Sequence, residues 1–153
     1  MDDFDFIGQN DHPAVLALSN VDAVTMAKAD LAGMGYKVHA VQTHEQFESR
    51  YYMVNYEVVV IEETFAGSST FDNPSLRLLQ NMSMQFRRHA AIFLLGEGYE
   101  TMNTLQAFAQ SVHAVINYAD IGMLSQVIQR TVAENDLFLG AYREAQNRIL
   151  HKR

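Results

Sequence analysis

A run of four β-branched residues, Val-Val-Val-Ile at positions 58–61, constrains the fold of this chain more than any other feature. Branching at the β-carbon favours extended backbone, and an apolar run without polar alternation indicates a strand that is buried on both faces. The run ends abruptly at Glu62 and Glu63. Such a strand belongs at the centre of a parallel sheet that is covered by helices on both sides.

Similar apolar runs recur along the chain, and segments with helical spacing of their apolar residues separate them. The predicted strands span 14–18, 36–42, 58–61, 90–95 and 114–116. The predicted helices span 21–34, 43–55, 74–88 and 101–112, and a fifth begins at about residue 120. We therefore predict an α/β fold in which a doubly wound, five-stranded parallel sheet is flanked by five helices, the last of them extended towards the C-terminus.

Capping signals support several of these helix boundaries. Thr43 and Gln46 have the spacing of a capping box, in which each side chain accepts a hydrogen bond from the backbone amide of the other residue. Asn73 precedes Pro74, which combines a favourable N-cap with a proline in the first helical turn. Asp120 is the predicted N-cap of the final helix.

Composition excludes several classes of function. Of the 153 residues, 18 are Asp or Glu and 11 are Lys or Arg, which gives a formal charge of −7. An acidic surface repels phosphate backbones and anionic lipids, and no apolar run reaches the roughly 20 residues that span a bilayer. The chain has no cysteine. We therefore expect a cytoplasmic protein that binds neither nucleic acid nor a membrane directly.

Charge and periodicity also divide the chain into three parts. The N-terminal part is acidic, with Asp2, Asp3, Asp5 and Asp11. We predict an acidic, flexible tail over residues 1–12, a single folded domain over residues 13–134 and a helical extension over residues 135–153.

The sequence lacks the motifs of common enzymes and cofactor sites. The loop after the first strand, residues 19–24, contains no glycine, which argues against a dinucleotide or flavin cofactor. No Gly-x-Ser-x-Gly segment is present, and no two histidines have the spacing of a zinc site. We therefore predict that the protein is not an enzyme and that it carries no cofactor or metal.

The residues that follow the predicted strands carry a resemblance to a known family. They are Ser19 and Asn20 after the first strand, Glu62 after the third, Leu95 and Gly96 after the fourth, and Tyr118 and Ala119 after the fifth. Glu62 lies five residues after Glu57, which opens the third strand. In its order of elements and this spacing, the segment from Pro13 to Glu134 resembles the receiver domain of bacterial two-component response regulators.

Receivers hold Mg²⁺ with paired acidic residues after the first strand and accept a phosphoryl group on an aspartate after the third. They carry a switch threonine or serine after the fourth strand and a lysine followed by proline after the fifth. Each of these positions is replaced in the present chain. The resemblance therefore implies a degenerate pseudo-receiver in bacterial signal transduction, which acts through protein–protein interaction and dimerisation instead of aspartate phosphorylation.

Two interpretations of Glu62 remain open at this point. Its side chain is one methylene longer than that of aspartate, and a shift of about 1 Å in a reacting group can lower a rate about 10²-fold. A fixed negative charge near the phosphoryl position can favour a permanently active state. In the other interpretation, Glu62 is an ordinary residue at a solvated strand end.

The final helix carries a sustained heptad pattern, with apolar or small residues at alternating spacings of four and three. Its positions are Leu124, Ile128, Thr131, Asn135, Phe138, Tyr142, Ala145 and Ile149. The pattern predicts a helical dimer contact. The alternative is that residues 121–132 pack on the sheet and the remainder is an exposed linker.

The resemblance adds a second candidate contact surface. Receivers commonly dimerise or bind partners through the face made by their fourth helix, fifth strand and fifth helix. Here that face would include Leu105, Phe108, Tyr118, Leu124 and Ile128. We therefore expect a homodimer or a complex with a signalling partner.

A different class of function is the alternative. The strand-end pocket, with Asn20, Glu62 and Tyr118, would then bind a small molecule or nucleotide as a phosphorylation-independent sensor. An enzyme of flavodoxin-like fold is a third possibility, but the sequence shows no catalytic constellation for it.

Overall fold

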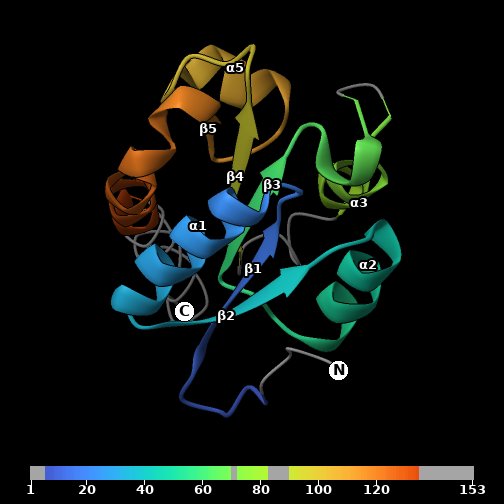
Figure 1. The fold of residues 1–153 in the computed structure, drawn as a ribbon, viewed down its shortest axis with the longest axis vertical. Coiled ribbons are helices and arrows are strands. Elements are labelled where there is room, and N and C mark those ends of the chain that lie inside the picture. The colour runs from blue at the N-terminus through green and yellow to red at the C-terminus, as the bar shows by residue number, and fades with distance from the viewer. Residues whose placement is uncertain (1–5, 70–71, 83–89, 135–153) are drawn as a thin grey trace, which may run out of the picture.

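The computed structural model describes residues 6–69, 72–82 and 90–134 (Figure 1). The strands are β1 (His12–Ala17), β2 (Tyr36–Val41), β3 (Val58–Glu62), β4 (Ala91–Gly96) and β5 (Ala114–Asn117). The helices are α1 (Val21–Gly33), α2 (His44–Met53), α3 (Pro74–Asn81) and α5 (Thr104–Ala109), with the 3₁₀ segments η1 (Phe65–Gly67) and η2 (Tyr118–Met123). A final helix spans residues 124–134, up to the end of the described chain.

The five strands form one parallel sheet in the order β2-β1-β3-β4-β5. The predicted parallel sheet is therefore confirmed, and β3 lies at its centre, as its β-branched residues indicate. The order along the sheet reverses direction between β1 and β3. In doubly wound sheets, ligands bind at the carboxyl ends of the strands beside this switch point. The loops that follow β1 and β3 are therefore the place to look for a site.

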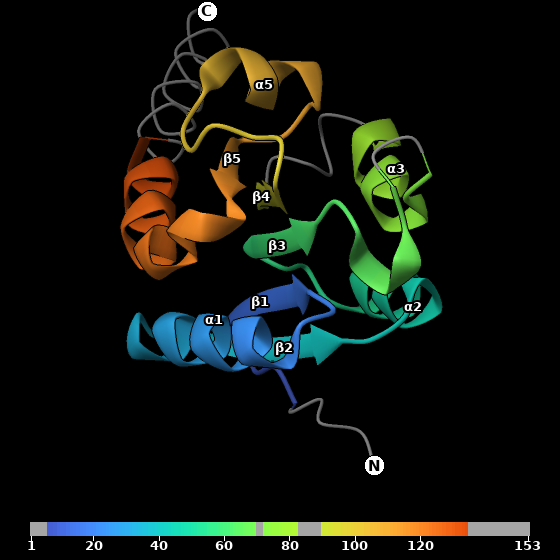
Figure 2. The same cartoon turned by 45° about the horizontal axis from the view of Figure 1, so that its top comes forward.

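Alternate residues of each strand face opposite layers of helices. Val58 and Val60 of β3 lie in the core cluster of the first face of the sheet, which packs against α1 and the final helix. Val59 and Ile61 lie in the cluster of the second face, which packs against α2, α3 and α5. Figure 2 shows α1 and the final helix on one side of the sheet and α2 and α3 on the other. Burial of both faces explains the absence of polar alternation in the strand sequences.

Two of the predicted helix caps are confirmed. The Thr43 hydroxyl accepts from the Gln46 amide at 3.1 Å, and the Asn73 side chain accepts from the Leu76 amide at 3.0 Å. The reciprocal half of the capping box differs from its usual form. The Gln46 side-chain oxygen accepts from the Gln42 amide at 2.8 Å, one residue before the N-cap.

The prediction of a helix over residues 101–112 is wrong at both ends, because α5 covers only Thr104–Ala109. Its N-cap is Asn103, whose side chain accepts from the Gln106 amide at 2.9 Å. Met102 has a positive φ of 66°, which is incompatible with a continuous helix. A tertiary contact explains the shortening, since the Thr101 hydroxyl donates to Asp120 at 2.6 Å.

The same contact corrects the predicted start of the final helix. Asp120 lies inside η2 and accepts from Thr101, so it does not act as an N-cap. Asn117 caps η2 instead, and its side chain accepts from the Ala119 amide at 2.9 Å. The predicted helix over 74–88 is described as far as Asn81, and residues 83–89 lie outside the described chain.

The segment that precedes β1 is described from residue 6, and β1 itself begins at His12, inside the predicted tail. The Lys37 ammonium donates to the carbonyl of Phe6 at 2.5 Å and lies 3.5 Å from the Asp11 carboxylate. These contacts hold residues 6–11 beside the start of β2. Among the described residues, no helix combines the length and the apolar character needed to cross a bilayer.

Candidate functional site

The carboxyl ends of β1 and β3 bring Ser19 and Glu62 into direct contact. One carboxylate oxygen of Glu62 accepts a hydrogen bond from the Ser19 backbone amide at 2.5 Å. Only 1% of the surface of Glu62 is exposed, so Glu62 is not a solvated strand end. A carboxylate removed from water requires hydrogen-bond donors, and the Ser19 amide supplies one of them. Glu62 therefore closes the space between the two strand ends.

The Ser19 hydroxyl extends this connection to the loop after β3. It accepts from the Ala66 backbone amide at 2.9 Å. Ala66 has a positive φ of 52°, a conformation that an alanine adopts only where surrounding contacts hold it. The loops that follow β1 and β3 are thus joined by two hydrogen bonds through one residue, Ser19.

A buried asparagine holds the other side of Glu62. Asn73 is 3% exposed, and its side-chain NH₂ donates to the carbonyls of Glu62 and Glu63, each at 3.1 Å. Its side-chain oxygen accepts from Leu76, so the same residue caps α3. Asn73 therefore couples the end of β3 to the start of α3 and satisfies two backbone carbonyls that would otherwise lack this donor.

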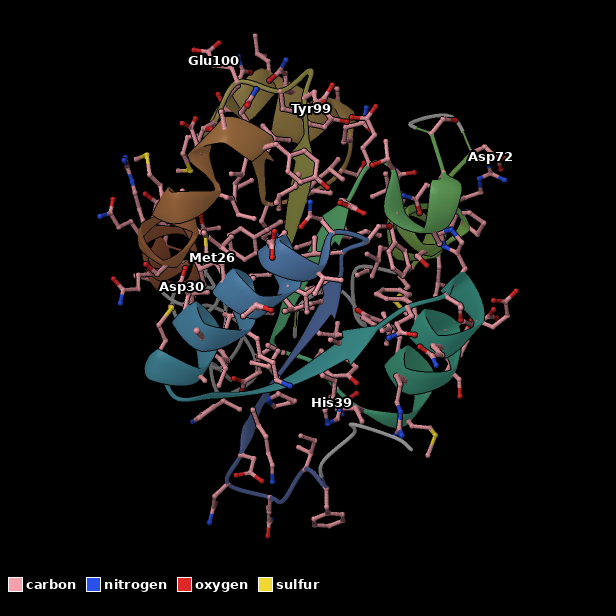
Figure 3. All side chains as sticks on the ribbon, in the orientation of Figure 1. Met26, Asp30, His39, Asp72, Tyr99 and Glu100 are labelled. Carbon is pink, nitrogen blue, oxygen red and sulfur yellow. The ribbon has the colours of Figure 1, made fainter. Side chains whose placement is uncertain are left out.

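Glu63 points towards the end of β4, away from Glu62. A methyl group built on Gly96 would lie 2.5 Å from a carboxylate oxygen of Glu63 and 2.7 Å from the ring of Tyr99. Gly96 is therefore required by the close approach of these two side chains. Burial raises the pKa of the Glu63 carboxyl, and the neighbouring charge of Glu97 raises it further. Figure 3 shows Tyr99 at this end of β4.

The loop after β4 is tied to β5 by Asn117. The Asn117 side-chain NH₂ donates to the carbonyls of Glu97 at 3.1 Å and Tyr99 at 2.8 Å. The Asn117 backbone amide donates to the Thr101 hydroxyl at 3.0 Å. Side chains of the chain itself therefore fix the loops at all four of these strand ends.

Several residues predicted for the pocket make other contacts. Asn20 caps α1, and its side chain accepts from the amides of Asp22 at 2.8 Å and Ala23 at 3.1 Å. Leu95 is fully buried in the core of the first face, and Tyr118 packs against the same core. Strand alternation directs Leu95 to this face, whereas Tyr118 reaches it from η2. Ala119 lies in η2. All seven predicted residues thus lie at or just after strand ends, and direct hydrogen bonds join two of them, Ser19 and Glu62.

Two residues at the site do not stand out in the sequence as site residues: Asn73 and Tyr99. The sequence identifies Asn73 only as a helix cap. Its second role depends on carbonyls ten and eleven residues earlier in the chain. Asn117, in contrast, is a candidate from the sequence alone, because it is a polar residue at the end of a predicted buried strand.

The described residues of the predicted contact surface fall into a buried group and an exposed group. Leu124 and Ile128 are fully buried against the sheet, so they are core residues and not surface residues. Leu105 and Phe108 of α5 are 79% and 85% exposed, as a contact surface requires. Asn135, Phe138, Tyr142 and Ile149 lie outside the described residues.

The described residues contain no group of three or more His, Cys, Asp or Glu side chains placed to hold a metal ion. A cavity of about 370 Å³ adjoins the ends of β1 and β2, and Ser19, Val21 and Gln42 line it. Asn20, Glu62 and Tyr118, the residues expected to bind a ligand, are not among its lining residues.

Comparison with known proteins identifies the fold. No protein-family model matches the chain, and no curated protein matches it. Solved structures do match, and receivers and response regulators are among them.

The receiver domain of a sensor histidine kinase from Pseudomonas aeruginosa PAO1 is 15% identical, with 80% of this chain and 98% of that chain covered and a TM-score of 0.62. The receiver domain of HemR from Leptospira biflexa is 13% identical, with 79% and 94% covered and a TM-score of 0.62. An orphan response regulator of H. pylori is 15% identical, with 79% and 96% covered and a TM-score of 0.60. The chain thus has the fold of response-regulator receiver domains.

The two roles of Asn73 generate a testable prediction. Asn73→Ala removes an N-cap and leaves one buried and one partly buried carbonyl without this donor, so we expect a loss of about 2–4 kcal/mol in the free energy of unfolding. Asn20→Ala, which removes only an exposed N-cap, should lose about 1 kcal/mol. Urea unfolding measures both values. Equal losses in the two variants would contradict a bridging role for Asn73.

The raised pKa of Glu63 gives a prediction on pH. Because folding favours the protonated carboxyl, Glu63 contributes to the free energy of unfolding. This contribution is fully present below the unfolded pKa, near 4.5, and is lost as the pH rises through the folded pKa. Glu63→Gln should therefore raise the melting temperature at pH 7 and have a smaller effect near the unfolded pKa. Glu97→Gln should lower the pKa of Glu63, as NMR titration measures. A Glu63→Gln variant less stable than the parent at pH 7 would contradict this.

Proposed function

We propose that this chain is a pseudo-receiver, a domain of the receiver fold that signals through protein contacts and not through a phosphorylated aspartate. The observation that carries the proposal is the buried carboxylate of Glu62, which accepts from the Ser19 amide at 2.5 Å. The space beside the third strand is filled by the chain's own side chain. An incoming phosphoryl group would have to displace it.

The residues after β1 support the same conclusion. The related Pseudomonas receiver was solved with a magnesium ion coordinated in its active-site cleft. A hard cation of this kind takes carboxylates and other oxygen ligands. In this chain Ser19 and Asn20 follow β1, and their side-chain oxygens accept from the amides of Ala66 and of α1. Without charged ligands, the metal would not be held to neutralise a phosphoryl group.

Fixed loops favour a single conformational state. In this proposal, the Glu62–Ser19 bond, the Asn73 bridge and the Asn117 contacts keep the strand-end loops in place without an input at this site. A two-state element can be shifted only by a ligand that binds the two states differently. The domain therefore presents the same surface for recognition at all times. Only the presence of a partner, or of a second copy of the chain, decides whether that surface is occupied.

An exposed apolar pair on α5 supports a role in protein contact. Leu105 and Phe108 lie three residues apart, which places them on the same side of a helix. Adjacent exposed Leu and Phe side chains are typical of an interaction surface. Dimerisation through the final helix would add the heptad positions beyond residue 134.

A small-molecule sensor remains the second candidate function. The 370 Å³ cavity beside β1 and β2 is the observation that favours it, because ligand pockets have volumes of about 300–1,000 Å³. The absence of Glu62 and Tyr118 from its lining makes this candidate weaker than the pseudo-receiver.

Phosphoryl uptake tests the proposal. We expect no incorporation from labelled acetyl phosphate with Mg²⁺, because the acidic pair is missing and Glu62 is buried. A receiver with an intact acidic pair serves as the positive control in the same reaction. Incorporation at Glu62, mapped by mass spectrometry, would contradict the proposal.

The solution mass tests the dimer. We expect the full chain to have twice the chain mass of 17.3 kDa by light scattering, and a chain that ends at Glu134 to be a monomer. The shorter chain retains the described core residues of the final helix, from Leu124 to Val132. If both chains are monomers, the heptad positions do not make a dimer contact.

A further inference from the structure

The cavity of about 370 Å³ lies between the first half of α1 and the carboxyl ends of β1 and β2. Figure 2 shows α1 alongside these two strands. Its lining comes from three segments: residues 18–19 after β1, the α1 residues Val21, Val24 and Thr25, and residues 40–42 at the end of β2. A cavity of about 150 Å³ can hold benzene, so this volume admits a ring that carries a short substituent.

No ionisable side chain is among the described residues that line this cavity. The lining differs in this respect from the chain as a whole, in which 19% of the residues are Asp, Glu, Lys or Arg. A charged ligand that entered the cavity would lose hydration and meet no opposite charge in the lining, which is unfavourable. The lining therefore favours an uncharged molecule.

The floor of the cavity is apolar and belongs to the core of the sheet. Leu18 and Val41 are only 3% and 1% exposed. Val24 and Ala40 are half-buried and pack against the core of the first face. Ordered core side chains give this floor a fixed shape, and a preformed surface lowers the entropic cost of binding. The floor therefore suits the apolar body of a ligand.

The polar end of the cavity lies at the carboxyl edge of the sheet, because Ser19 and Gln42 follow two strands that pair in parallel. The Ser19 hydroxyl accepts from Ala66 at 2.9 Å, and among the described residues no contact uses its hydrogen. The Gln42 side chain is exposed, and the bond from this residue to Gln46 uses only the Gln42 backbone amide. Two side-chain donors are therefore available to a ligand.

From these features we propose that the cavity binds an uncharged molecule with an apolar body and one carbonyl group. The carbonyl accepts from the Ser19 hydroxyl and the Gln42 side-chain amide, and the body lies against Leu18, Val24 and Val41. The proposal rests on the second candidate function, the small-molecule sensor, and names its ligand class. It does not depend on the pseudo-receiver function, because phosphoryl uptake concerns the end of β3.

Ser19 also connects the cavity to the loop after β3. Its backbone amide donates to Glu62 at 2.5 Å, and its hydroxyl accepts from Ala66. A ligand that binds the Ser19 hydroxyl is therefore one residue away from both contacts. We expect the NMR signal of the Ala66 amide to shift when the cavity is filled, although Ala66 does not line it.

Three probes that share a phenyl ring test the ligand class: phenylacetamide, phenylacetate and 2-phenylethylammonium. Binding to the full chain is followed by NMR, with the amides of Leu18, Ser19 and Val41 as reporters of the cavity. We expect saturable binding of phenylacetamide with a Kd of about 1–5 mM, and binding of each ion weaker by about tenfold. The ammonium ion is the stringent control, because the acidic surface of the chain would attract it if charge alone governed binding.

The outcomes separate this proposal from the function on which it rests. If either ion binds in the cavity as tightly as the amide, the proposed ligand class is wrong, whereas the cavity remains a ligand site. If none of the probes saturates by about 20 mM, both the ligand class and the sensor function are wrong for this cavity.

A charge placed in the lining tests the location. Gln42→Glu adds a carboxylate at the polar end, so we expect binding of 2-phenylethylammonium to strengthen about fivefold and binding of phenylacetamide to weaken. Gln42 is exposed, so this substitution leaves the core intact. Gln129→Glu makes the same change at an exposed position of the final helix, outside the lining, and should leave all three affinities unchanged. Unchanged affinities in Gln42→Glu would overturn the assignment of the cavity.

Discussion

The hydrogen bond between the Glu62 carboxylate and the Ser19 amide joins β1 and β3 at the carboxyl edge of the sheet. It forms at the switch point of the sheet, where the strand order reverses and where doubly wound proteins place their ligands. A hydrogen bond to a charged group contributes about 1.5–3 kcal/mol, and a buried carboxylate without donors would be strongly unfavourable. The surrounding backbone is arranged to provide that donor, and Ser19 then connects onward to Ala66.

The consequence is a receiver fold whose strand ends are held by internal contacts. Asn73 couples the end of β3 to α3, and Asn117 couples the loop after β4 to β5. Under the proposed function, these contacts leave no free position at the strand ends for a phosphoryl group. In the proposed function, what remains available for recognition is the outer surface, above all the exposed Leu105 and Phe108 of α5.

The architecture could be predicted from the sequence because the patterns that determine it involve residues close together in the chain. The β-branched run at 58–61, the alternation of elements and the caps at Thr43 and Asn73 each act within a few residues. The site was harder to predict because the residues that contact one another there are far apart in the sequence. Ser19 and Glu62 are 43 residues apart, and Thr101 and Asp120, which shorten α5, are 19 apart.

The heptad pattern shows a second limit of local reasoning. Apolar residues three and four apart describe both a coiled-coil seam and a helix that packs on a sheet. Leu124 and Ile128 belong to the second case, since both are fully buried in the core. The spacing alone does not distinguish these two cases. The structure does, because it shows these two residues packed on the sheet.

The most direct measurement of the central claim is the NMR signal of the Ser19 amide during titration with Mg²⁺ and beryllofluoride, which together imitate a bound phosphoryl group. We expect the Ser19 resonance to stay at its original position, because the Glu62 carboxylate retains this amide and no acidic pair follows β1 to hold the metal. A saturable shift of Ser19 together with residues at the end of β3 would contradict it, since it would mean that the site opens to a phosphoryl group.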